Sequence, residues 1–65
     1  MLDDKLEIRI ELLNAKGETE RLLAMAATIP IGRGAFDAAV KEYGARYGVM
    51  MRAGARVIEQ RDKTL

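Results

Sequence analysis

The chain contains no cysteine, no histidine, no serine and no tryptophan. Without cysteine it can form no disulfide, and without cysteine and histidine it lacks the usual ligands of a structural zinc ion. The same absences remove the nucleophile and base pairs on which most covalent catalysis depends. We therefore expect a protein that is not an enzyme and that binds no metal or cofactor.

Long apolar runs are also missing. No segment approaches the roughly 20 apolar residues that a membrane-spanning helix needs. The first residues, MLDDKLEIRI, carry acidic side chains where a signal peptide has its basic region. We expect a cytoplasmic protein with no membrane partner, folded as one small domain over residues 1–65, with frayed ends at about 1–4 and 61–65.

Hydrophobic residues make up 49% of the chain and charged residues 32%, a composition that favours a folded domain over disorder. A chain this short buries only about 60% of its unfolded surface, so that its core needs added support. Disulfides and zinc are excluded as sources of this support, so association with a second copy of the chain is the remaining source. We therefore expect a homodimer.

Residues 5–12 alternate polar and apolar side chains, which predicts a strand with Ile8, Ile10 and Leu12 on its buried face. The other face, with Glu7, Arg9 and Glu11, should be wet. The following Asn14–Gly17 segment has the composition of a bulged hairpin turn. A regular hairpin after this turn would place Glu11 opposite Arg21 and Ile8 opposite Ala24.

Residues 19–28 allow two interpretations, because their composition favours a helix whereas the turn before them favours a strand. We favour the strand, continued in extended form through Thr28 and Ile29. One face of that strand would then carry Leu23, Met25 and Ile29, and a single helix cannot cover both faces of a sheet. These three residues are the predicted dimer interface.

A helix is predicted from the apolar stripe of Phe36, Ala39, Val40 and Tyr43. It should end at Tyr43, although Tyr47 is the alternative end. The Gly32-Arg33-Gly34 segment before it is interpreted as a flexible joint after Pro30, with anion binding as the less favoured interpretation because the P-loop residues are absent.

Residues 49–60 fit either two short strands around Ala53-Gly54 or one long strand bulged at Gly54. The predicted fold is therefore α+β: a small antiparallel-hairpin sheet with one helix packed on it, approximately ββαββ. This order resembles that of the β-grasp proteins, which include ubiquitin-like proteins and sulfur carriers. Sulfur carriers end in Gly-Gly, whereas this chain ends in Lys63-Thr64-Leu65, so the resemblance implies no carrier chemistry.

Positive charge gathers in the second half of the chain. Residues 1–30 carry four basic and six acidic side chains, a net charge of −2, and residues 31–65 carry seven and four, a net charge of +3. We expect a small interaction or assembly protein with itself or an unidentified protein as partner. The alternative is a weak nucleic-acid or anionic-ligand binder, with contacts from Arg33, Arg46, Arg52 and Arg56.

Overall fold

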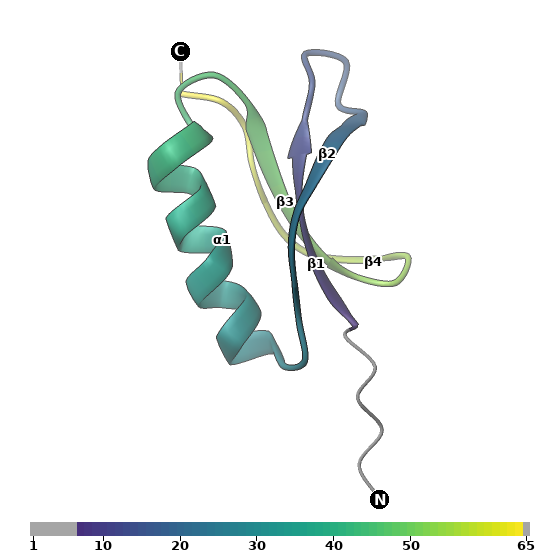
Figure 1. Ribbon diagram of the computed structural model, residues 1–65. Helices are drawn as coiled ribbons and strands as arrows, with labels where there is room; N and C mark the ends of the chain where they lie inside the picture. The colour runs from purple at the N-terminus through teal and green to yellow at the C-terminus, as the bar shows by residue number, and fades with distance from the viewer. Residues whose placement is uncertain (1–6, 65) are drawn as a thin grey trace, which may run out of the picture.

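The computed structural model of the chain describes residues 7–64. The elements along the chain are β1 (Ile8–Leu13), β2 (Thr19–Ala26), α1 (Ile29–Tyr43), β3 (Gly48–Ala53) and β4 (Arg56–Arg61). The strands form one sheet in the order β2-β1-β3-β4, and every neighbouring pair is antiparallel. The helix α1 lies against one face of this sheet (Figure 1). The predicted α+β fold of ββαββ order is confirmed.

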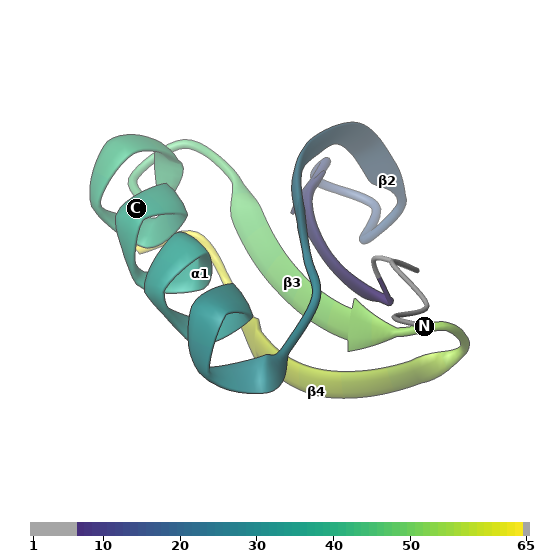
Figure 2. The same cartoon turned by 60° about the horizontal axis from the view of Figure 1, so that its bottom comes forward.

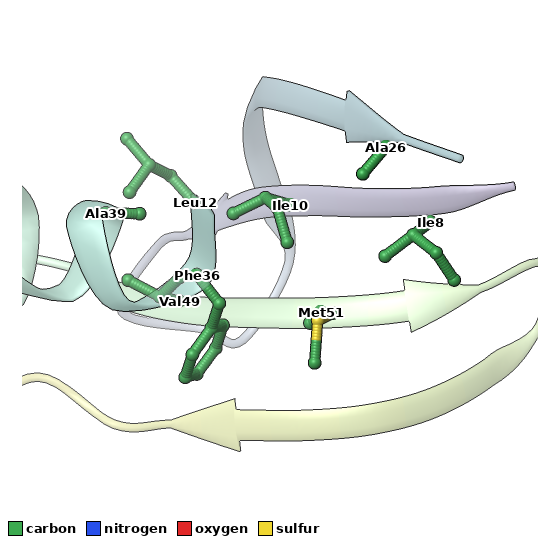
Figure 3. Packing of buried hydrophobic residues seen from close by; sticks show 8 residues of the cluster. All are labelled: Ile8, Ile10, Leu12, Ala26, Phe36, Ala39, Val49 and Met51. Atoms are coloured by element: carbon green, nitrogen blue, oxygen red, sulfur yellow. The ribbon is translucent and has the colours of Figure 1, made fainter. Parts of the chain in front are cut away.

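The hydrophobic core lies between α1 and the two central strands. Ile8, Ile10 and Leu12 of β1 and Val49 and Met51 of β3 are buried on the face that meets the helix. Phe36 and Ala39 of α1 pack into this layer (Figure 3). The predicted alternation of β1 and the predicted apolar stripe of α1 are confirmed, since Val40 and Tyr43 are half-buried against the same cluster. Burial of a large apolar side chain stabilises the fold by about 1.5–3 kcal/mol.

The helix begins earlier than the sequence pattern indicates. Thr28 is its N-cap, and the Thr28 hydroxyl accepts a hydrogen bond from the Ile31 amide at 3.3 Å. Pro30 lies in the first turn, where its missing N–H costs no helical hydrogen bond. The prediction that Ile29 is extended and that Gly32-Arg33-Gly34 is a joint is therefore wrong. The helix ends at Tyr43, as predicted.

Gly32 lets α1 approach the sheet closely. A Cβ atom at this position would lie 2.5 Å from Cγ2 of Ile8 and 3.4 Å from the sulfur of Met51. Any larger residue would therefore push the first turns of the helix away from β1 and β3. Gly34, two residues later, has no such neighbour within 4 Å.

Residues 19–26 form the strand β2. The strand interpretation of this segment is therefore confirmed, and the helix interpretation is wrong. The turn at Asn14–Gly17 is the predicted one: Gly17 has a φ of 81°, and its amide donates to the Asn14 carbonyl at 2.9 Å. The register departs from the predicted one, because two irregularities shift the pairing along β2. Glu11 lies opposite Leu22, and Ile8 lies opposite Ala26.

The C-terminal segment forms two strands joined at Gly54, whose φ is 59°. This outcome selects the two-strand interpretation over a single bulged strand. Arg61 belongs to β4, and the amide of Thr64 donates to the Gly44 carbonyl at 2.9 Å, which fastens the last described residues beside the end of α1. The predicted fraying of residues 1–4 concerns residues outside the described range.

Within residues 7–64 there is no helix long and apolar enough to cross a membrane.

Candidate functional site

The sheet has one face that no other described element covers, and we call it the helix-free face. Figure 2 shows α1 along one side of the sheet and no described helix or strand over the opposite side. Arg9 and Glu11 of β1 point to this side, because their neighbours Ile8, Ile10 and Leu12 point into the core. Cross-strand partners share a face, so the register identifies the other members. They include Leu22 and Met25 of β2, Met50 and Arg52 of β3, and Val57 and Gln60 of β4.

Four apolar side chains of the helix-free face form what we call the apolar patch: Leu22, Met25, Met50 and Val57. Leu22 and Met25 are each 41% exposed and Val57 is 50% exposed, while Met50 is half-buried. In the register, Glu11 lies between Leu22 and Met50, and Arg9 and Arg52 lie between Met25 and Val57, so that the apolar groups flank the charged ones. Several large apolar groups exposed on one face are typical of interaction surfaces. The apolar patch is therefore the first component of the candidate site.

A buried carboxylate lies among these apolar groups. Glu11 is fully buried, although its strand face was predicted to be wet. Arg52 binds it through two contacts, Nε to Oε1 and Nη2 to Oε2, both at 3.0 Å. Arg9 donates from Nε to Oε2 at 3.0 Å, and the Thr19 hydroxyl donates to Oε1 at 3.0 Å. The prediction of a solvated charged face is thus wrong at Glu11, where three side chains replace water.

These contacts fix the charge state of the cluster. Hydrogen bonds from Arg52, and to a smaller extent from Arg9 and Thr19, lower the pKa of Glu11 from its ordinary value of 4.5 to about 2, against the opposing effect of burial. The carboxylate is therefore ionised at neutral pH. It holds the guanidinium groups of Arg9 and Arg52 against the sheet, and Arg52 also donates from Nη1 to the Gly54 carbonyl at 3.0 Å.

The predicted interface residues do not share one face. Met25 lies on the helix-free face opposite Arg9. Leu23 lies at a register irregularity, is half-buried and packs against the core cluster. Ile29 is the first residue of α1 and is 45% exposed on the helix side. Of the three, the structure leaves Met25 in the candidate site and adds Leu22, Met50 and Val57.

The four arginines of the alternative prediction are not brought together. Arg33 forms an ion pair with Glu59, and Arg52 binds Glu11. Arg46 lies in the connection between α1 and β3, whereas Arg56 begins β4 at the opposite end of the β3–β4 ladder. Two of the four side chains are therefore held by carboxylates, and the other two lie at opposite ends of the sheet.

No three acidic side chains among residues 7–64 come together in a way that could hold a metal ion. Comparisons with protein-family models, with curated proteins and with solved structures found no match to this chain. The resemblance to β-grasp proteins is accordingly one of element order alone, and functional inference rests on the geometry of the residues themselves.

Proposed function

We propose that this chain is a small cytoplasmic interaction protein without catalytic chemistry, and that it assembles as a homodimer through its helix-free face. The observation that carries the proposal is the apolar patch around the Glu11 cluster. A domain of this size gains little from its own core, and a second copy would cover the apolar patch of both molecules at once.

The charges on the helix-free face favour a second copy as the partner. Arg9 and Arg52 supply two positive charges, and Glu11 supplies one negative charge between them. The sum of the three is +1. Two such faces can therefore approach with little repulsion between like charges, whereas a strongly charged partner would gain little from this face.

The sheet edges favour association through the face over pairing of edge strands. The edge strand β2 has two register irregularities against β1, and the edge strand β4 has one against β3. Irregularities of this kind twist an edge strand and interrupt its free hydrogen-bonding groups, which hinders the addition of a further strand. The apolar patch is thus the favoured route of self-association.

Sedimentation velocity at micromolar concentrations tests the proposal. We expect the native chain to sediment as a dimer and Met25→Glu as a monomer, because a carboxylate in the apolar patch would lose its hydration on burial in the contact, a cost that Arg9 opposite it offsets only in part. Ile29→Glu is the matched control, since Ile29 is about as exposed as Met25 but lies on α1, and this variant should remain a dimer. Circular dichroism should show that both variants are folded.

A native monomer would contradict the proposal. A dimer that both substitutions disrupt equally would also contradict it, since the contact would then not be specific to the helix-free face.

A further inference from the structure

A cleft of about 530 Å³ opens at the end of the sheet where β1 turns into β2. Its walls come from three separate segments: the β1–β2 turn with Asn14, the α1–β3 connection with Arg46 and Tyr47, and the end of β4 and the residues after it with Gln60, Asp62 and Lys63. The volume lies in the range of roughly 300–1,000 Å³ that is typical of small-molecule sites. None of the residues of the apolar patch lines this cleft.

The walls of the cleft are fixed by hydrogen bonds within the chain. The Asn14 side-chain oxygen accepts from the amides of Lys16 and Glu18 at 2.9 and 3.0 Å. The Tyr43 carbonyl accepts from the amides of Arg46 and Tyr47, both at 2.9 Å. The bond from Thr64 to Gly44 holds the residues after β4 against the same connection. The cleft is therefore formed before any ligand binds, which lowers the entropic cost of binding.

Two cationic side chains, Arg46 and Lys63, line the cleft, and neither is held by a carboxylate among the described residues. Arg33, Arg52 and Arg9 are paired with carboxylates, whereas neither Arg46 nor Lys63 forms an ion pair among residues 7–64. Both side chains are exposed.

The one carboxylate in the lining is that of Asp62, so the cleft carries a net charge of +1 from two cations and one anion. The carbonyl oxygens of Tyr43 and Gly44 at the end of α1 already accept backbone hydrogen bonds, which reduces their repulsion of an anion.

We infer that this cleft binds the phosphate group of a small organic molecule, such as a nucleoside monophosphate, through Arg46 and Lys63. A guanidinium can bind two phosphate oxygens at once, and the ammonium group adds a second charge. Asp62 and Gln60 supply acceptors for hydroxyl groups of the same ligand, and the half-buried Tyr47 supplies an aromatic surface. The inference does not depend on the proposed dimer.

NMR titration of the ¹⁵N-labelled full chain tests the inference with three probes: adenosine monophosphate, inorganic phosphate and adenosine. We expect adenosine monophosphate to shift the amides of Ala15, Gly17 and Gly48, which line the cleft, in a saturable manner. Inorganic phosphate should shift the same amides with weaker affinity, and adenosine should leave them unchanged at equal concentration.

Arg46→Ala should weaken binding of adenosine monophosphate about tenfold, through loss of the charged donor. Arg56→Ala is the matched control, because Arg56 is exposed and unpaired among the described residues but lies at the other end of the sheet. Three results would overturn the inference: no saturable shift at millimolar adenosine monophosphate, equal shifts with adenosine, or an equal loss of affinity in both variants.

Discussion

Arg9 and Arg52 lie directly opposite each other on β1 and β3, and both bind the same carboxylate of Glu11. Like charges in this cross-strand position repel and destabilise a sheet. Glu11 offsets that repulsion because its two oxygens accept hydrogen bonds from both guanidinium groups. The pair of arginines on the helix-free face therefore depends on one buried acid.

Replacement of that acid by its neutral isostere should destabilise the fold. Glu11→Gln keeps the shape of the side chain but leaves two facing arginines without a counter-charge, and we expect the free energy of unfolding to fall by about 1–3 kcal/mol. Urea denaturation at one fixed protein concentration measures this loss. The control is Glu20→Gln, at an exposed position of β2, which should change stability by less than about 0.5 kcal/mol. Equal losses in the two variants would show that the cluster is not the cause.

The free energy of unfolding should depend on pH through the ionisation of Glu11. The pKa of this carboxyl is about 2 in the folded chain and 4.5 ordinarily, so the unfolded state binds more protons between these values. The stabilisation is complete above pH 4.5 and is lost as the pH falls toward 2. After allowance for solvent around the partly exposed arginines, the loss is on the order of 1–3 kcal/mol.

Parallel unfolding curves of the native chain and of Glu11→Gln, recorded from pH 6 down to pH 2, isolate this contribution. The two chains share every other carboxyl group, and only the native chain should show the added loss between pH 4.5 and 2. Curves that stay parallel throughout would argue against an ionised, hydrogen-bonded Glu11.

Two glycines of α1 should respond to alanine with opposite signs. Gly32→Ala places a methyl group 2.5 Å from Cγ2 of Ile8 and should cost about 1–3 kcal/mol through overpacking. Gly34→Ala meets nothing within 4 Å and should stabilise the helix by about 0.5–1 kcal/mol. Thermal unfolding of both variants measures the difference, and stabilisation of both would mean that α1 does not approach β1 as closely as described.

Much of the fold could be predicted because the spacing of apolar residues along the chain indicates which face of a strand or helix is buried. The alternation around Ile8 and Ile10 identified the core face of β1, and the spacing of Phe36 and Ala39 identified the buried stripe of α1. The turn before Gly17 was predictable because few residue types adopt its positive φ.

The start of α1 was predicted too late in the chain, for a local reason. A threonine followed by proline within two residues fits a helix N-cap and first turn, as observed at Thr28 and Pro30. The same proline also fits the end of a strand. The close approach of Gly32 to Ile8 accompanies the helical start, and it joins residues too far apart in the chain for local sequence to indicate it.

The candidate site was less predictable, because it depends on strand irregularities. An extra residue in β2 leaves the composition unchanged but moves the side chains that follow it to the other face, until the second irregularity restores the alternation. For this reason Leu23 packs toward the core and Leu22 lies opposite Glu11, which no pattern in the sequence indicates. Burial of Glu11 likewise required Arg52, which is 41 residues away along the chain.

The sheet order β2-β1-β3-β4 has a kinetic consequence. The outer ladders each join strands that follow one another in the chain, and such hairpins form in about 1–10 μs. The central ladder joins β1 to β3 across the whole of α1, with Leu13 paired to Gly48 and Ile8 to Ala53. We expect the rate of folding to be limited by the pairing of the two hairpins through the β1–β3 ladder. Substitutions at Ile10 and Met51, which pair in this ladder, should therefore slow folding more than substitutions in either turn.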